Sequence, residues 1–560
     1  MTDWRVHPAL EEAAPLASQL RIHPLVASIL FRRGLRSAAE MTRFLSPSLD
    51  DLQDPYAFTD MKISVERIRR AITGKEKILV YGDYDVDGVT AAAILFPALR
   101  SLGADVEVHL PHRIKEGYGL NLSSLKDWVR RGVELVITVD NGITSLDCVR
   151  FLKEKGVGVI LVDHHIPKEA IPPADAILSG ALPGRGGDPT LAACGLAFKL
   201  VWALLGDFEK AKPYLDLVTL GTVADLAPVE GENRTLLKWG LPILARSRRP
   251  GIRALMSLAG IHPDYLSYRD IAFGLGPRIN AAGRMGSPMH AFKLLVTENE
   301  LEARNLAQIL EAGNRERQRA EAEACREAMR YVEEKLSEDE RHILVVEGGD
   351  WHEGVLGIVA SRLVEHYHRP AIVIALREDG LGKGSGRSLP HFSLFKHVHQ
   401  CEDLLSAFGG HDQACGLSIR HENLKEFRRR LNELAGRTFS SAKGEEGPWL
   451  EGELRPAQLD PAFVSDLEKL APFGPGNERP LFMSRGMHVR GEVKKRGKDT
   501  LQCWMTDSEE KVTCEVVGFR SYERWQSQAQ KKREFDIIYQ PTLRKFNGIT
   551  SITLELESWR

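Results

Sequence analysis

Acidic and imidazole side chains follow three separate apolar runs of this 560-residue chain. The runs and the residues after them read ILVYGDYDVDG, VITVDNG and VILVDHH. The side chains concerned are Asp83, Asp85, Asp87, Asp140, Asp163, His164 and His165. If the runs are parallel strands, their carboxyl ends meet in one crevice, where open α/β sheets bind ligands. The pattern therefore predicts a single cluster of carboxylates and imidazoles.

Such a cluster requires cations, because buried carboxylates repel one another and are costly to bury unless they are neutralised. Mixed Asp and His ligands suit Mn²⁺ or a similar transition metal, whereas sites made only of oxygen suit Mg²⁺. So many candidate ligands favour a pair of ions. Two ions about 3.5–4 Å apart activate water and stabilise the leaving oxygen when a phosphoester is cleaved.

Two simpler interpretations explain less of the pattern. A calcium loop of the EF-hand type also begins D-x-D-x-D-G, but its twelfth position must be Glu, and this chain has Ile94 there. That loop also follows a helix, whereas Asp83 follows a predicted strand. A helix N-cap accounts for one Asp and leaves the other two unexplained.

The elements that would position these residues are predicted from hydrophobic periodicity. Apolar, β-branched runs alternate with helical stretches, which is typical of a parallel, doubly wound α/β sheet. The predicted strands are Ile78–Tyr81, Val106–Leu110, Leu135–Val139 and Val157–Val162. The predicted helices are Thr90–Leu102, Ser123–Arg131, Thr144–Lys155, Leu191–Leu205 and Leu215–Val229.

Further modules follow this sheet. Residues 297–337 are rich in Glu, Ala, Arg and Leu and predict a long connecting helix. A second α/β unit follows, then the linker-like stretch 440–448, then short alternating strands that predict a small β-barrel. The expected parts are an N-terminal helical segment (1–50), a first α/β domain (51–296), a connecting helix (297–340), a second α/β domain (341–438) and a barrel (446–560).

Composition sets the class of protein. Hydrophobic residues make up 43% and charged residues 27%, as in ordinary globular proteins. No apolar run is long enough to span a membrane, and the N-terminus does not look like a signal peptide. Seven scattered cysteines indicate reduced thiols and a cytoplasmic protein. The net charge of −2 argues against coating nucleic acid by bulk charge but allows a local basic groove.

The segments GDYDVDG, VDNG, VDHH and GTVADLAPV resemble, in order, the four motifs of the DHH phosphoesterase superfamily. The resemblance implies that Asp140 bridges two metal ions. The ligand set it implies is completed by Asp83, Asp85, His164 and Asp225. Asp87 and His165 are either ligands or residues that orient ligands, and Asp163 supports the histidine pair.

Three further features narrow the substrate. The first, GLGPRINAAGRMG (274–286), is expected to be a Gly-rich loop that carries Arg278 and Arg284. An arginine fork suits phosphate, although solvated arginines in a structural loop are the simpler alternative. The segment resembles the RecJ family of exonucleases within the DHH superfamily, which makes both arginines candidate contacts to the DNA backbone.

The second feature is a pair of segments, GKGSGRS and FGGHDQACG, that resemble the substrate motifs of the DHH-associated domain. Glycines let a backbone approach an anion, although GSG is also a common turn. The resemblance implies that Ser385, Arg387, Gly409, Gly410 and His411 form a pocket for a terminal 5′-phosphate, with His411 as an acid or a phosphate donor. Two residues of PHRIKEGYGL are expected beside them: Arg113 on phosphate, and Tyr118 either stacked on a base or serving as a turn aromatic.

The third feature is the barrel, which follows another RecJ-like segment, PFGPGNERPLF, and is expected to be an OB-fold that binds single strands. Its candidate contacts are Lys494, Lys495, Arg496, Lys498, Arg544, Lys545, Trp504, Phe519 and Tyr539. For any one of these, a core aromatic or a solvated lysine is the simpler interpretation. One segment, LSGALPGRGGDP, departs from the family, where an Asn-Pro pair is expected.

We therefore expect a 5′→3′ exonuclease that acts on single-stranded DNA, releases 5′-mononucleotides with Mn²⁺ or Mg²⁺, and serves DNA recombination and repair. The expected partner is single-stranded DNA with a 5′ end; a single-strand-binding protein or a helicase is a candidate protein partner, and a monomer is expected. One alternative is a DHH phosphodiesterase that acts on short oligonucleotides or cyclic dinucleotides. Another is a non-catalytic, single-strand-binding replication factor.

Overall fold

The computed structural model describes residues 4–8, 10–167, 170–439, 449–507, 512–529, 534–546 and 549–560. The chain forms two compact units. The larger unit comprises 53–227 and 240–443, and the smaller comprises 1–52, 228–239 and 444–560. The linker-like stretch 440–448 lies outside the described residues. Within the described ranges, none of the helices is both long and apolar enough to cross a membrane.

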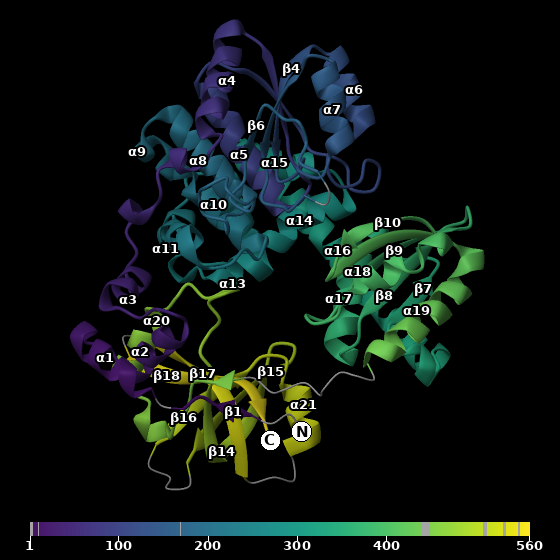
Figure 1. Ribbon diagram of the computed structural model, residues 1–560. Coiled ribbons are helices and arrows are strands. Elements are labelled where there is room, and N and C mark those ends of the chain that lie inside the picture. The colour runs from purple at the N-terminus through teal and green to yellow at the C-terminus, as the bar shows by residue number, and fades with distance from the viewer. Residues whose placement is uncertain are drawn as a thin grey trace. The chain divides into compact units, whose positions relative to one another are not determined.

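The predicted parallel sheet is confirmed in the larger unit (Figure 1). Its order is β3-β2-β4-β5-β6, and every neighbouring pair is parallel. The strands are β2 (Lys77–Tyr81), β3 (Asp105–His109), β4 (Val133–Val139), β5 (Gly158–Val162) and β6 (Ala176–Leu178). β5 is buried along its whole length, which is why its sequence is a continuous apolar run and does not alternate.

Helices cover both faces of this sheet (Figure 1). α6 and α7 lie on one face, where Trp128 and Leu152 pack against strand residues such as Val136 and Leu161. α4, α5 and α8 lie on the other face. The bounds are α4 (Met61–Gly74), α5 (Val86–Ser101), α6 (Leu122–Arg130), α7 (Leu146–Glu154), α8 (Ala193–Leu205) and α10 (Leu215–Ala224).

The Gly-rich segment 274–286 is helical, so the predicted loop is wrong. A π-helical turn (Ile271–Leu275) leads into α14 (Gly276–Met285). The glycine that matters most is Gly283, where a Cβ would lie 2.6 Å from the carbonyl oxygen of Tyr84. Glycine at this position lets the helix approach the turn that carries Asp83 and Asp85. The high glycine content of the segment therefore reflects close packing and does not indicate a loop.

The predicted connecting helix is confirmed as α16 (Glu300–Lys335), which leads into a second sheet ordered β10-β11-β9-β8-β7. The elements are β7 (Leu344–Gly348), α17 (Leu356–Tyr367), β8 (Ala371–Leu376), β9 (Leu381–Arg387), α18 (Leu394–His399), β10 (Leu405–His411), β11 (Ala414–Arg420) and α19 (Leu424–Phe439). GKGSGRS is therefore the central strand β9 and not a turn. A Cβ on any of its three glycines would lie 2.7–2.8 Å from a neighbouring side chain. Lys383, Ser385 and Arg387 share the opposite face of the strand.

The predicted barrel is confirmed in the smaller unit. Its order is β13-β14-β15-β16-β18-β17, and an additional β14–β17 pairing makes a partly closed ring. The strands are β13 (Gly452–Glu453), β14 (Phe482–Arg496), β15 (Thr500–Thr506), β16 (Thr513–Gly518), β17 (Glu534–Phe546) and β18 (Ile549–Trp559).

The N-terminal helices belong to the core of this barrel unit. They are α1 (Ala14–Leu20), α2 (Pro24–Arg32) and α3 (Ala38–Leu45). Leu30 and Met41 lie in one apolar core with Phe463, Phe482 and Tyr539. A short parallel pair, β1 (Arg5–Val6) with β12 (Trp449–Leu450), adds a second link between the N-terminal segment and the segment that precedes the barrel strands.

Arg234, in α11 (Gly231–Ala245), joins three segments of this unit. Its guanidinium lies 3.7 Å from the ring centre of Phe44. It donates to the carbonyl oxygens of Phe44 (2.9 Å), Leu470 (2.8 Å) and Ala471 (3.2 Å). Buried carbonyl groups need donors, and Arg234 supplies a donor to each of these three. Asn477 also donates to Leu470 (2.9 Å) and Lys238 to Ala471 (3.0 Å).

We predict that Arg234→Met lowers the free energy of unfolding by about 3 kcal/mol, because the Phe44 carbonyl loses its side-chain donor and the Leu470 and Ala471 carbonyls each lose one of two. The urea midpoint and melting temperature, followed by tryptophan fluorescence, measure the loss. Arg43→Met is the control, since that side chain is 73% exposed and should cost less than about 0.5 kcal/mol. Equal effects of the two substitutions would contradict the structural role.

Candidate metal centre and phosphate cavity

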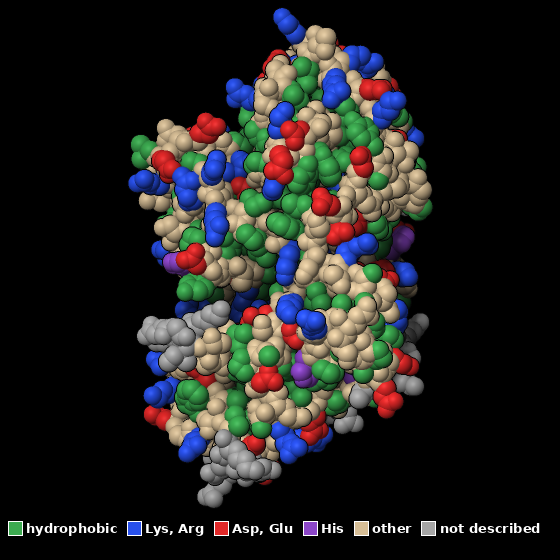
Figure 2. Space-filling model, turned by 90° about the vertical axis from the view of Figure 1, so that its left-hand side faces the viewer, with side chains coloured by type: hydrophobic (Ala, Val, Ile, Leu, Met, Phe, Trp, Pro, Cys, Tyr) green, Lys and Arg blue, Asp and Glu red, His purple; other side chains and the backbone are tan. Residues whose placement is uncertain are grey.

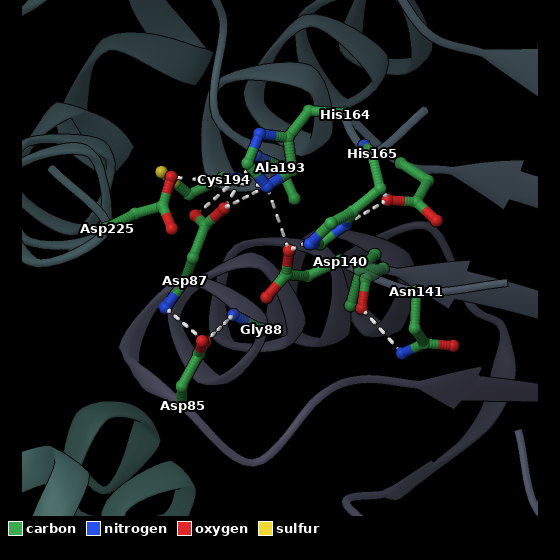
Figure 3. A network of polar contacts seen from close by, with 12 residues as sticks. Asp85, Asp87, Gly88, Asp140, Asn141, His164, His165, Ala193, Cys194 and Asp225 are labelled. Carbon is green, nitrogen blue, oxygen red and sulfur yellow. Dashed lines mark hydrogen bonds and ion pairs between the residues drawn. The ribbon is translucent and has the colours of Figure 1, made fainter. Parts of the chain in front are cut away.

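The acidic and imidazole residues predicted to converge do so at the carboxyl ends of the first sheet (Figure 3). The strand ends contribute Asp83 after β2, Asp140 after β4, and His164 with His165 after β5; Asp85 and Asp87 lie at the start of α5, and Asp225 follows α10. Their ligand atoms form three groups, and within each group the atoms lie within 4.8 Å of one another. The groups are Asp83, Asp85 and Asp140; Asp140, His164 and His165; and Asp87, His164 and Asp225.

Asp140 and His164 link these groups, because each belongs to two of them. His164 Nε2 lies 3.2 Å from Asp140 Oδ1 and 4.0 Å from Asp225 Oδ2. Asp140 has a φ of 63°, a left-handed conformation that is uncommon for a residue with a side chain. Strain of this kind is tolerated where a functional site requires it. An Asp shared between two groups is the arrangement that a pair of ions requires.

The cluster is electrostatically unfavourable without a cation. Burial and neighbouring carboxylates raise the pKa of Asp83 and Asp140 well above the ordinary value, and the same causes raise the pKa of Asp225 to about 9. Three buried atoms have no hydrogen-bond partner among the described residues: Asp83 Oδ1, Asp140 Oδ1 and His164 Nε2. Unpaired buried acceptors that face one another fit a site for divalent cations.

Asp87 differs from the other carboxylates because backbone groups already satisfy it. Its Oδ2 accepts from the Ala193 amide at 2.7 Å, and its Oδ1 accepts from the Cys194 amide at 2.8 Å (Figure 3). Its Oδ2 still lies 3.9 Å from His164 Nε2. Asp87 therefore fixes the start of α8 against α5 while keeping a carboxylate beside the cluster.

Asp163 orients the neighbouring histidine. Its Oδ1 lies 2.8 Å from His165 Nδ1, and its Oδ2 accepts from the Ile143 amide at 2.9 Å. Although burial alone would raise the pKa of Asp163, its hydrogen bond to His165 lowers it below the ordinary value. The same pairing raises the pKa of His165 against the effect of burial. A carboxylate that holds an imidazole in this way is a common support of metal ligands.

A cationic cavity lies beside the acidic cluster. It has a volume of about 400 Å³, and we call it the phosphate cavity. Its lining includes Tyr84, Arg113, Gly357, Ser385, Lys383, Glu353 and Ser418. Tyr84 connects the two sites, because it stands between Asp83 and Asp85 in the sequence and also carries the Arg113 guanidinium 4.8 Å from its ring centre.

Arg113 lines this cavity, and Arg284 and Arg387 contact two of its lining residues, Gly354 and Ser385. None of the three arginines has a carboxylate partner within the described part of the chain. Burial and the neighbouring guanidinium groups lower the pKa of Arg284 to about 9. Burial and Arg113 lower the pKa of Arg387. Gly357 makes room for them, since a Cβ there would lie 2.8 Å from Arg387 Nη2. Guanidinium groups that are held together despite their mutual repulsion are suited to binding an anion.

Several predicted substrate residues lie elsewhere. Arg278 is engaged by Glu311 (2.7 Å) and by the Gly274 carbonyl (2.7 Å), so it fastens α14 to α16. The Tyr118 hydroxyl lies 3.3 Å from His165, beside the acidic cluster. His411 is exposed at the end of β10. The residues that line the phosphate cavity do not include Gly409, Gly410 or His411.

Three residues of the site were not predicted. Asn141 donates to the carbonyls of Tyr81 and Val139 beside the cluster. Tyr84 and Lys383 line the phosphate cavity. The period of two along β9 would have revealed Lys383, because it shares a face with Ser385 and Arg387. For Tyr84, only its position between Asp83 and Asp85 indicated that it would lie near the site.

Comparison with known proteins matches three parts of the chain to family models. Residues 77–222 match the DHH family, N-terminal domain; residues 340–437 match the DHHA1 domain; and residues 450–558 match the RecJ OB domain. The single-stranded-DNA-specific exonuclease RecJ of Bacillus subtilis is 37% identical, over 93% of this chain and 66% of its own length. The Haemophilus influenzae protein of the same name is 32% identical over 96% of each chain.

Solved structures agree with these relatives. The crystal structure of RecJ in complex with Mn²⁺ from Thermus thermophilus has a TM-score of 0.84 at 29% identity, covering 100% of this chain and 79% of that one. RecJ from the same organism in complex with Mg²⁺ has a TM-score of 0.78 at 28% identity, covering 100% of this chain and 78% of that one.

We predict that Mn²⁺ raises the melting temperature of EDTA-treated protein, and more at pH 7.5 than at pH 6.0. Carboxyls with raised pKa bind protons in the folded state, so metal-free stability falls as pH rises from about 4, the ordinary Asp value, to about 9, the value for Asp225. Mn²⁺ replaces those protons, so its binding strengthens over the same range.

Differential scanning fluorimetry measures both shifts. Asp140→Asn should raise the metal-free melting temperature, because it removes one repelling charge, and should shrink the gain from Mn²⁺. A Mn²⁺ gain that is equal at both pH values, or that survives Asp140→Asn, would contradict the proposed ligand cluster.

Proposed function

The chain belongs to the RecJ family of single-stranded-DNA-specific exonucleases, and we propose that it hydrolyses single-stranded DNA from the 5′ end and releases 5′-mononucleotides. One observation carries the proposal: a cluster of carboxylates and imidazoles lies beside a cavity that is bordered by three arginines without carboxylate partners in the described part of the chain. The cavity suits a terminal phosphate, and the cluster suits the metal ions that cleave the next phosphodiester. End-specific cutting follows from that juxtaposition.

We assign two divalent cations, Mn²⁺ or Mg²⁺, to Asp83, Asp85, Asp140, His164 and Asp225, with Asp140 shared between them. When bound, such ions supply Lewis acidity, which lowers the pKa of water and stabilises charge on phosphoryl oxygens. The protein supplies the geometry. Two further groups complete the set: Asp87 and His165 lie close enough to serve as ligands or to orient them.

Arg113, Ser385 and Arg387 are the residues to which we assign the terminal 5′-phosphate. Ser385 and Arg387 point from the same face of β9, and the Arg387 guanidinium lies 3.3 Å from Ser385 Oγ. Arg284 adds a third cation from α14 and donates to the Gly354 carbonyl at 3.1 Å. Contacts of Arg278, Tyr118, Gly409, Gly410 and His411 with DNA stay predictions.

We assign to the barrel the binding of longer single strands. Its candidate aromatics differ in exposure: Trp504 is 50% exposed, whereas Tyr539 is fully buried and belongs to the core. Lys495 and Arg544 are partly engaged by Glu523 and Glu515. Figure 2 shows a face on which Lys and Arg are interspersed with Asp and Glu, in keeping with the net charge of −2. Binding of a long strand therefore depends on local groups and not on total charge.

The rival functions have less support. A phosphodiesterase for short oligonucleotides has no use for residues 450–558, which match the RecJ OB domain. A non-catalytic binding factor has no need of a complete ligand cluster. The role in recombination and repair, the cytoplasmic location, the monomeric state and the helicase or single-strand-binding partners are expectations from the family and stay predictions.

We predict that the chain with Mn²⁺ releases mononucleotides from a 5′-labelled single strand at the first cleavage, whereas a 3′ label is released last. EDTA should abolish the activity, and a blunt duplex should resist it. Asp140→Ala should lower the rate at least about a hundredfold, since metal ions stabilise the transition state by several kcal/mol. Early loss of a 3′ label would refute the polarity.

We predict that Arg387→Met weakens recognition of the 5′-phosphate without destabilising the protein. The ratio of rates on 5′-phosphorylated and 5′-hydroxyl strands should fall about tenfold, because a charge-assisted hydrogen bond is lost. The melting temperature should hold or rise, because one of several repelling guanidinium groups is removed.

Arg429→Met is the matched control, since that arginine is exposed on α19 and pairs only with glutamates of its own helix among the described residues. It should leave the ratio unchanged. A stable Arg387→Met protein with the parent's ratio would remove Arg387 from the phosphate site.

A further inference from the structure

The phosphate cavity extends beyond the residues assigned to the terminal phosphate. Lys383 and Ser418 line it together with Ser385. Lys383 and Ser385 share a face of β9 two residues apart, which spaces their Cα atoms by about 6.6 Å. Ser418 lies opposite Lys383 in the β9–β11 register, and its Oγ accepts from Lys383 Nζ at 2.6 Å. The cavity therefore holds a second polar pair next to the first.

The charge in the cavity also exceeds what one phosphate neutralises. Arg113 and Lys383 line the cavity, and Arg284 and Arg387 contact its lining residues Gly354 and Ser385. None of these four cations is paired with a carboxylate in the described ranges. Glu353 lines the cavity as well, but its carboxylate lies 2.5 Å from the Arg377 guanidinium and is neutralised there. A terminal monophosphate brings about two negative charges at neutral pH. Additional phosphate groups would balance the remainder.

We propose that the cavity also accepts 5′-triphosphate ends, with Lys383 and Ser418 binding the outer phosphates while Ser385 and Arg387 keep the inner one. This inference rests on the proposed exonuclease function. Acidic side chains do not block the outer position, because the one carboxylate in the described cavity lining is already paired. The volume of about 400 Å³ leaves space for more than a single phosphate.

The reaction at such an end is an ordinary hydrolysis. The oxygen of water bonds to the phosphorus between the first and second nucleotides, and the bond from that phosphorus to the 3′-oxygen of the first nucleotide breaks. The departing 3′-oxygen takes a proton. The first nucleotide leaves as a nucleoside 5′-triphosphate, and the second becomes a 5′-monophosphate end. Each strand therefore yields one nucleoside triphosphate, followed only by monophosphates.

The test compares three single strands of one sequence that carry a 5′-hydroxyl, a 5′-monophosphate or a 5′-triphosphate, each with full-length protein and Mn²⁺. Product chromatography should show one nucleoside triphosphate per triphosphate strand. Lys383→Met should lower the ratio of rates on triphosphate and monophosphate strands about tenfold, which corresponds to about 1.4 kcal/mol. Lys396→Met, at an exposed position on α18, should leave that ratio unchanged.

Two results would overturn the proposal. One is degradation of the monophosphate strand while the triphosphate strand is refused or is first trimmed to a monophosphate. The other is a parental ratio in Lys383→Met. Both leave the exonuclease function intact, because the monophosphate strand is degraded in the same assay. Failure on all three strands would instead contradict the exonuclease function itself.

Discussion

Repulsion among buried carboxylates is the constraint on which this site depends. Asp83, Asp140 and Asp225 are brought together by elements far apart in sequence, and their pKa values rise because each is buried beside other carboxylates. A fold would avoid this arrangement unless ions compensated for it. The surrounding structure holds the carboxylates together against their repulsion. β2, β4 and β5 are hydrogen-bonded side by side, and Asp87 fastens α8 to α5 through two backbone amides.

A second cluster, of positively charged arginines, lies beside the carboxylates and is also unfavourable by itself. Arg284 and Arg387 are partly buried cations that repel each other and Arg113. Tyr84 borders both groups, since it follows Asp83 in the chain and packs under Arg113. Two clusters of opposite sign, each unfavourable alone, become complementary when a phosphorylated strand and its metal ions lie between them. Catalysis and end recognition therefore have one electrostatic origin.

Much of the fold could be predicted, because the strands of the first sheet are uniform apolar runs whose ends carry the reactive residues. The site was predictable to the same extent: Asp140 and His164 follow such strands directly. Glycine-rich segments misled in two ways. Gly283 permits close helix packing in α14, and the glycines of β9 face a tight core, so neither segment is the loop or turn that its composition suggested. A high glycine content indicates a flexible segment only where no other atoms pack against the glycines. The pairing of Arg278 with Glu311 depends on tertiary contacts that no local pattern encodes.

The shared core of the first fifty residues and the barrel has a consequence for biosynthesis. Helices α1 to α3 leave the ribosome long before Phe482 and Tyr539, which cover their apolar sides. The larger unit lies between them in the sequence and can assemble in the meantime. During most of translation the early helices therefore wait with uncovered apolar faces. A message that ends prematurely would yield a chain that contains the metal ligands but also an aggregation-prone beginning.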